Sequence, residues 1–458
     1  MKSKVTSLNL DNFTSTTTLA TNEINASIQS KESLNDEYNP FEHRIVEHPT
    51  STIGSLIHLL KGALGTGILA MPHAFKNAGL LVGSVATLVI GFLCTYCIRI
   101  LVSASRDICR KSKVPSLGLA ETCGAAFQYG PKSLRKYSGA VKLIVDVALV
   151  TTYFMGVCVY IVFIGESIEQ LVNHWFPKIQ MDTRIYSTIT MVPLLLSTQI
   201  RQLKYLVPFS LLSNISLLIA FGITLYYIFN ETLNTSNVAL FESASRFPTF
   251  LSTVIFAMEG IGIIMPIENT MKHPEHFLGC FGVLNIAMGT VVAVYAIIGF
   301  FGYTKFGEGT EASITLNLPV EESLAQSVKL LVVLAVFLTY NLQAYVALDV
   351  IWKRVLSPKV DGKLKSNFVQ ITMRCSFVVG TVIIAVAVRN LEPIITLVGS
   401  VCLSTLGIFL PAVIDTVLHW EELGFLKWRL IKNIFLCLFS LIALVSGSTI
   451  AIRSLINS

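Results

Sequence analysis

Two short segments combine glycines with a Met-Pro pair, and both interrupt runs of apolar residues. The first is Leu60-Lys-Gly-Ala-Leu-Gly-Thr-Gly-Ile-Leu-Ala-Met-Pro72 and the second is Met258-Glu-Gly-Ile-Gly-Ile-Ile-Met-Pro266. Glycine weakens a helix and lets its backbone open, and an opened backbone presents amides and carbonyls that can bind the charged ends of a small ligand. The two segments therefore predict a pair of interrupted helices with a binding site between them.

The candidate substrate contacts come from these two segments. Half-helix N-termini carry a partial positive charge that favours a carboxylate, so a zwitterion with a carboxylate and an amine fits such a site. Glycine pairs also have a simpler role, because small residues let neighbouring membrane helices approach closely. The candidate contacts are Gly65, Thr66, Gly67, Glu259, Gly260 and Gly262.

Some ionisable side chains lie deep within apolar runs, where a charge is costly and marks a functional candidate. His58 precedes Gly65 by about two helical turns. Because an imidazole changes charge near physiological pH, His58 is the first candidate for proton coupling and Glu259 is the second. The alternative for His58 is a neutral histidine that hydrogen-bonds a neighbouring helix. Lys61 needs an acidic partner, and we expect an intramembrane ion pair with Asp146, or with Glu259, of structural or gating role.

Long apolar helices must position these residues. The chain has 458 residues, of which 53% are hydrophobic and 14% charged, a balance that indicates a membrane protein. The predicted fold class is all-α with about eleven transmembrane helices of about 20 residues each. Ten or twelve helices are alternatives, because the fourth run is short and contains Pro193. The runs lie at about 52–73, 79–101, 141–168, 185–200, 206–229, 248–271, 279–303, 324–351, 370–390, 393–418 and 431–453.

The basic residues indicate how the helices are oriented. Most of the 34 Lys and Arg lie in the N-terminal tail and in the connections on its side, which places the tail in the cytosol and the C-terminus outside or in a lumen. Asn230 and Asn234 begin acceptor sequons in a loop expected outside, and we predict that both carry glycans. Asn12 and Asn25 also begin sequons, but they lie in the tail, where we expect no modification.

The two glycine-rich segments occupy the first helix of each of two consecutive five-helix blocks. Because five is odd, the second block must run with inverted topology. Interrupted first helices in inverted repeats are typical of the LeuT-type transporter architecture, here with one extra helix. We expect a disordered cytosolic tail over 1–49 and a transporter domain over 50–455. The parts of that domain are repeat one at about 52–229, repeat two at about 248–418 and the extra helix at about 431–453.

The stretch from Leu56 to Gly79 resembles the proton-assisted amino acid transporters of the amino acid/auxin permease group. The resemblance implies eleven helices, a cytosolic N-terminus and proton-coupled symport of small neutral amino acids such as glycine, alanine and proline. Further matches are Tyr38-Asn-Pro-Phe-Glu-His-Arg44, Phe256-Ala-Met-Glu-Gly-Ile-Gly262, Pro266-Ile-Glu-Asn-Thr-Met-Lys272, Gly302-Tyr and Ser313-Ile-Thr-Leu-Asn-Leu-Pro319.

The same resemblance points to His58 as the proton site, with the proton as coupling ion and no cofactor or metal. The sequence departs from the family in two places. Ala63 stands where the better-known members have an asparagine, which affects the expected substrate range. Those members are also expected to carry an external disulfide, and no cysteine of this chain lies in a predicted external loop.

The sequence also allows alternatives to proton-coupled transport. The chain has no H-E-x-x-H, G-x-S-x-G or P-loop motif, so an enzyme is not predicted. A sodium-coupled relative of the same group, an amino-acid sensor at the lysosomal membrane and, less favoured, a channel are alternatives. Tyr38 to Phe41 has the Tyr-x-x-apolar form of an adaptor-binding signal, so the plasma membrane and the lysosome are both candidate locations. The expected partners are a small amino acid, the lipid bilayer and an adaptor at Tyr38, without nucleic acid.

Overall fold

The computed structural model of the chain describes residues 38–44, 46, 49–178, 181–201, 203–230, 238–258, 260–360, 362–388 and 390–457. Within these ranges every regular element is a helix, and an isolated β-bridge joins Thr50 to Met271. The all-α prediction is therefore confirmed.

The helices follow the predicted apolar runs. The first half of the chain contains α2 (Thr52–Ala63), η1 (Thr66–Ala70), α3 (Met71–Ala78), α4 (Leu80–Ser112), α5 (Leu119–Tyr129), η2 (Arg135–Tyr137), α6 (Ser138–Trp175), α7 (Thr183–Ile189), α8 (Met191–Ser197) and α9 (Leu203–Phe229). The second half contains α10 (Phe247–Ala257), α11 (Ile261–Thr270), η4 (Pro274–Phe277), α12 (Val283–Phe306), η5 (Gly307–Gly309), η6 (Ile314–Asn317), α13 (Ser323–Ile351), η7 (Trp352–Leu356), η8 (Ser357–Lys359), α14 (Lys363–Ala387), α15 (Leu391–Leu397), η9 (Val398–Leu403), η10 (Thr405–Phe409), α16 (Leu410–Leu418), η11 (Phe425–Lys427) and α17 (Trp428–Asn457).

Most of these helices are long and apolar enough to cross a membrane. In the described part of the chain nine helices meet that test, and the pair formed by Thr52–Ala63 and Thr66–Ala78, bent by 43°, makes a tenth. The fourth predicted run is divided into α7 and α8, of seven residues each, which meet at Thr190. Neither α7 nor α8 alone is long enough to cross a membrane, so this run has the length of a span only if the two helices are taken together.

Helix α4 shows how the sequence separates a lipid-facing side from a packed side. Its large apolar side chains at the i, i+4, i+7 and i+8 positions share one helix face. That face is half or more exposed, which is stable against lipid and unfavourable in water. The exposed residues are Leu81, Val85, Leu88, Val89 and Phe92. The opposite side is buried and includes Gly83, Thr87, Ile90, Gly91 and Cys94.

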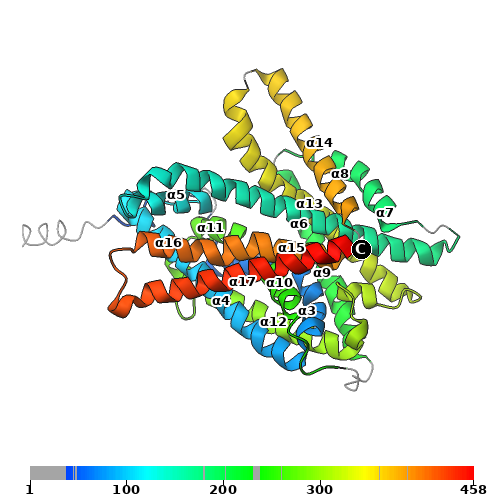
Figure 1. The fold of residues 1–458 in the computed structure, drawn as a ribbon. Coiled ribbons are helices and arrows are strands. Elements are labelled where there is room, and N and C mark those ends of the chain that lie inside the picture. Colours follow the sequence, from blue (N-terminus) through cyan, green and yellow to red (C-terminus); the bar gives the residue numbers. More distant parts are fainter. Residues whose placement is uncertain are drawn as a thin grey trace, which may run out of the picture.

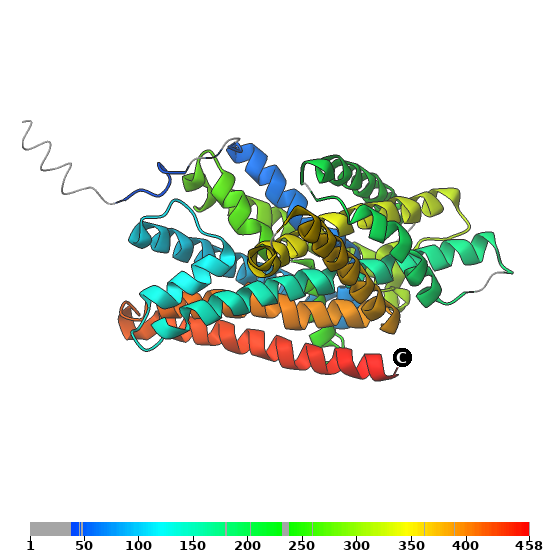
Figure 2. The ribbon, with the colours of Figure 1, turned by 90° about the horizontal axis from the view of Figure 1, so that it is seen from above.

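The helices form an elongated bundle (Figure 1). Helix α13 packs against α6 and α9, α12 packs against α3 and α4, and α17 runs along one flank in contact with α15 and α16 (Figure 2). We call the end that carries residues 38–44, 49 and 50, α5 and the loop between α16 and α17 the tail face. The opposite end carries residues 238–246 and 307–322, and we call it the loop face.

The last described residues of the predicted tail lie against the helix bundle, and the disordered cytosolic tail expected over 1–49 stays a prediction. Residues 38–44 pack on the tail face, where Arg44 donates to the carbonyl oxygens of Pro115 at 2.9 Å and Glu268 at 3.0 Å. Thr50 pairs with the chain after α11. The reason is that this polar stretch carries an arginine that neutralises a buried carboxylate, a contact that composition alone does not reveal. Residues 1–37 lie outside the described ranges.

Candidate functional site

The first and sixth apolar runs are both interrupted, as the glycines predict. Helix α2 ends at Ala63, and Gly65 is the N-cap of the 3-10 turn η1, which leads directly into α3 with Pro72 in its first turn. Helix α10 ends at Ala257, and Gly260 is the N-cap of α11. Glu259, predicted both as a substrate contact and as a proton carrier, lies outside the described residues.

The candidate glycines fall into two groups according to what surrounds them. A Cβ atom on Gly65 or Gly260 would meet no atom within 4 Å. A Cβ atom on Gly67 would stand 2.6 Å from the Cα atom of Ala257, and one on Gly262 would stand 1.9 Å from the Tyr153 hydroxyl oxygen. Gly65 and Gly260 thus border open space, whereas Gly67 and Gly262 allow close packing.

A small cavity with a free volume of about 20 Å³ lies beside the first break. Its walls come from η1, α6, α10, α13, α15 and the segment before η6. Aromatic and aliphatic side chains dominate, with a few hydroxyl groups, which is the usual lining of a small-molecule site. The lining residues are Thr66, Ala70, Val159, Tyr160, Phe163, Phe256, Ala312, Ser313, Val336, Leu391 and Ile395. Of the predicted contacts, Thr66 lines this cavity, and Gly260 lines a second small cavity beside the other break.

Polar contacts hold the loop face together above the cavity. Glu166 of α6 accepts a hydrogen bond of 2.8 Å from the backbone nitrogen of Leu391, the first residue of α15. Lys329 of α13 is fully buried, and its ammonium group donates to the Gln170 side chain at 2.7 Å and to the Thr315 carbonyl at 2.8 Å. These contacts tie α6 and α13 to the segments that cover the cavity.

A second pair of contacts on the loop face involves α3. The His73 Nε2 atom lies 3.5 Å from a carboxylate oxygen of Glu392 in α15. Lys76 donates to the carbonyl oxygen of Thr310 at 3.1 Å. Helix α3, the half-helix that follows the first break, is thus attached to both neighbouring segments of this face.

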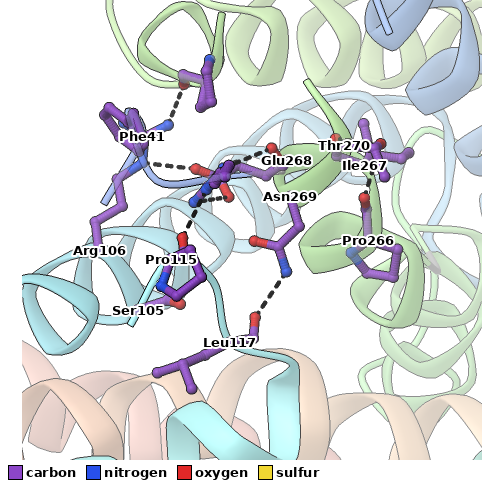
Figure 3. Close-up of polar contacts among 12 residues, drawn as sticks. Phe41, Ser105, Arg106, Pro115, Leu117, Pro266, Ile267, Glu268, Asn269 and Thr270 are labelled. Atoms are coloured by element: carbon purple, nitrogen blue, oxygen red, sulfur yellow. Dashed lines mark hydrogen bonds and ion pairs between the residues drawn. The ribbon is translucent and has the colours of Figure 1, made fainter. Parts of the chain in front are cut away.

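On the tail face, Glu268 lies between two arginines and pairs with both (Figure 3). Its side chain is buried, and Arg44 Nη2 and Arg106 Nε each lie 3.0 Å from one of its carboxylate oxygens. The guanidinium carbons of both arginines lie 5.0 Å from the ring centre of Phe41. One buried acid on α11 therefore pairs with both α4 and the tail segment, and Phe41, the apolar residue of the predicted adaptor signal, is half-buried against the two arginines.

The structure places the predicted charged residues differently from the expected ion pair. Asp146 is paired with Arg354, whose Nη1 atom lies 2.7 Å from Oδ2, and among the described residues no ion pair joins Asp146 to Lys61. Lys61 and His58 both lie on the exposed side of α2, outside the cavity lining. The physical reason is that α2 packs against α12 and α11, so this side of the helix turns away from the bundle and from α6.

Tyr295 of α12 is a contact of both breaks that the sequence did not indicate. Its hydroxyl group lies 2.6 Å from the carbonyl oxygen of Ala63 and 3.0 Å from that of Ala257. A tyrosine inside an apolar run carries no special signal, so only the three-dimensional arrangement identifies it. Arg44, by contrast, belongs to the tail motif that carried the family resemblance.

Comparisons with known proteins agree with this geometry. The family described as "Transmembrane amino acid transporter protein" matches residues 48–453. The chain is 39% identical over 426 residues to the Drosophila melanogaster protein "Proton-coupled amino acid transporter-like protein pathetic", covering 92% of this chain and 89% of that one. It is 27% identical over 419 residues to the Caenorhabditis elegans "Probable amino acid transporter skat-1", covering 88% and 90%.

The fold is also found among solved structures. The crystal structure of MhsT in complex with L-phenylalanine matches with a TM-score of 0.50 and 13% sequence identity, covering 88% of this chain and 99% of that one. This match supports the LeuT-type fold. Because the family match extends over nearly the whole described chain, the protein belongs to the transmembrane amino acid transporter family.

Proposed function

We propose that the protein is a secondary active transporter that carries small neutral amino acids together with protons. The observation that supports this most is the small cavity beside the first break, next to a glycine that borders open space. Helix interruptions at the bilayer midplane are where LeuT-type transporters bind their substrates. The relative from Drosophila is named as a proton-coupled amino acid transporter-like protein.

The size and lining of the cavity favour a small substrate. Tyr160, Phe163 and Phe256 occupy much of the space between α6 and α10, and the free volume that remains is about 20 Å³. This is far below the volume of typical ligand sites, about 300–1,000 Å³, so a substrate must displace side chains to enter and a small one displaces the fewest. The opened backbone around Gly65 and Thr66 would bind the substrate carboxylate through its amides. Glycine, alanine and proline are therefore the proposed substrates.

His58 is the proposed proton-coupling residue, with Glu259 as the second candidate. His58 lies on α2, the half-helix that leads to the first break, but outside the cavity lining. A protonation step at His58 would therefore act on the position of α2 and not through direct contact with the substrate. We assign the tail face to the cytosol, in agreement with the distribution of basic residues along the sequence.

The test is uptake of labelled glycine, alanine and proline by cells that express the protein. Uptake is measured at acidic and at neutral external pH, each with sodium and with choline as the external cation. We expect saturable uptake that rises at acidic external pH and is accompanied by inward current. Uptake that depends on sodium but not on pH would favour the sodium-coupled alternative, and currents without saturation would favour a channel.

The role of His58 is tested separately with His58→Ala at matched surface amounts. We expect the variant to bind substrate but to lose the pH dependence of the substrate-induced current. If the variant keeps the parent's pH dependence, the proton site is elsewhere and Glu259→Gln becomes the decisive variant.

A further inference from the structure

Two helix ends whose last carbonyl groups have no partner within their own helices meet at the centre of the bundle. The last four carbonyls of a helix have no partner within it, and the C-terminus carries a partial negative charge. Ala63 is the last residue of α2 and Ala257 is the last residue of α10. Both residues are buried, so their carbonyl groups need a donor or a cation.

The hydroxyl group of Tyr295 stands between these two ends. It lies 2.6 Å from the Ala63 oxygen and 3.0 Å from the Ala257 oxygen, and the Tyr295 side chain is completely buried. In transporters with interrupted helices, half-helix C-termini and unwound carbonyls are the groups that coordinate the coupling cation. In this chain the Tyr295 hydroxyl lies within hydrogen-bond distance of both carbonyl oxygens and can donate its hydrogen to either.

A simpler role for Tyr295 would be to fill space in the core. A phenylalanine would fill almost the same space, and it would leave both carbonyls without this donor. The hydroxyl, however, bridges the two interrupted helices from a third helix, α12. Its position is therefore better explained by the needs of the two helix ends than by packing.

We propose that the Tyr295 hydroxyl takes the place of a metal cation between the ends of α2 and α10 and thereby makes the transport cycle independent of sodium. The inference about transport rests on the proposed function, whereas the inference about cation binding does not. Tyr295 would thus determine which ion the protein uses.

The experiment compares three variants with the wild type. Tyr295→Asn removes the ring and supplies a side-chain oxygen, which opens the space between the two carbonyls to a cation. Tyr295→Phe keeps the ring and removes only the hydroxyl. Tyr303→Phe is the matched control, because Tyr303 is another fully buried tyrosine of α12 whose hydroxyl contacts Ala239 and Glu308 at the loop face.

The first measurement is uptake of labelled proline, alanine and glycine in sodium and in choline medium at fixed pH, corrected for the surface amount. The wild type and Tyr303→Phe should take up substrate equally in both media. Tyr295→Asn should take up several-fold more in sodium. Tyr295→Phe should show no sodium response and a KM raised about fivefold, the effect of losing one hydrogen bond that holds the substrate-binding break.

The second measurement needs no transport. The melting temperature of each purified protein is compared in sodium chloride and choline chloride, because a cation that binds only the folded state raises it. Sodium should raise the melting temperature of Tyr295→Asn and leave that of the wild type and of Tyr303→Phe unchanged.

The outcomes separate the inference from the proposed function. If the wild type takes up none of the three amino acids, the proposed function fails, and the melting temperatures alone decide the inference. The inference is overturned if the wild type needs sodium for uptake or is stabilised by it. It is also overturned if Tyr295→Phe has the wild-type KM or if Tyr295→Asn melts identically in both salts. Should Tyr295→Asn not fold, the KM of Tyr295→Phe and the wild-type sodium response decide.

Discussion

Gly65 and Gly67 are two positions apart on the chain and have opposite surroundings. Gly65 borders open space, and Gly67 faces the backbone of Ala257. In the proposed site, a side chain added at Gly65 would occupy volume that the substrate needs, whereas one added at Gly67 must displace a neighbouring helix. Overpacking of this kind costs about 1–3 kcal/mol.

We therefore predict that Gly65→Leu reaches the membrane in normal amounts and has lost uptake. Gly260→Leu should behave in the same way, since Gly260 also borders open space. Gly67→Ala should instead lower the amount of folded protein and its melting temperature. Surface labelling, radiolabelled uptake and thermal unfolding measure the three quantities. Normal uptake by both leucine variants would remove these glycines from the substrate site.

His419 lies just after α16, outside the spanning segment Leu391–Leu418. Its Nε2 atom is 3.6 Å from Asp107 and its Nδ1 atom is 3.3 Å from Asp415. These contacts, first that with Asp107, raise the pKa of His419 from 6.5 to about 9. Since the folded-state pKa is raised, the charged imidazole contributes stability that is complete below the ordinary pKa of 6.5 and is lost as the pH rises through about 9.

His419→Gln should therefore lower the melting temperature of the purified protein at neutral pH. The difference from the wild type should shrink as the pH is raised through about 9. His174→Gln, at an exposed histidine near the end of α6, is the control and should differ little from the wild type at any pH. A difference for His419→Gln that stays constant with pH would contradict the assigned contacts.

At the scale of the elements, the tail segment of residues 38–44 is bound to the helices of the tail face. Arg44 joins it to the buried Glu268 of α11. Cys109 of α4 is buried and close enough to Arg44 and Glu268 to interact with them electrostatically. Removing one partner of a buried ion pair costs about 3–5 kcal/mol, so the loss of Arg44 should release the segment.

We predict that Arg44→Ala increases the rate at which a membrane-permeant maleimide labels Cys109, measured by mass spectrometry. The exposed Cys280 is first replaced by serine to reduce background labelling. Glu42→Ala is the control, because Glu42 is exposed and bonds to Asn39 within the same segment. Equal labelling of Cys109 in Arg44→Ala and the control would show that the segment does not close this face.

Hydropathy predicted where most helices lie along the sequence, but it did not predict which side of each helix faces the bundle. The apolar runs became helices because span length and side-chain hydrophobicity are local properties. The outward direction of Lys61 depends on the packing of α2 against α12 and α11, which no local pattern contains. Helix α5 was missed because it is short and lies in a polar connection, although the Glu121 side chain accepting from the Gly118 backbone is a capping pattern that spacing alone suggests.

At the scale of the whole molecule, the position of the glycans reports how the chain is oriented in the membrane. Asn230 is exposed directly after α9, and Asn234 lies outside the described residues. We predict that replacing both asparagines by glutamine abolishes the mobility shift caused by enzymatic deglycosylation. Replacement of Asn12 should leave the shift unchanged. A shift that survives the double replacement but disappears without Asn12 would reverse the assigned orientation.

The candidate site was predictable only in part. The positions of both breaks followed from glycine and proline, because these residues act on the local backbone. The division between Gly65, beside open space, and Gly67, packed on α10, did not follow, since it depends on which neighbour lies opposite each residue. Tyr295 could not be identified from the sequence for the same reason, because its hydroxyl contacts two carbonyl groups that are distant from it in the sequence.

The contact between Gly67 and Ala257 also restricts how the molecule can move. The turn η1 after the first break and the end of α10 touch through their backbones, with no side chain of Gly67 between them. A flexible side chain could absorb sliding at such a junction, but two backbones in contact transmit it. The two interrupted helices should therefore move as one rigid unit, and a displacement of α10 should displace α3 with it.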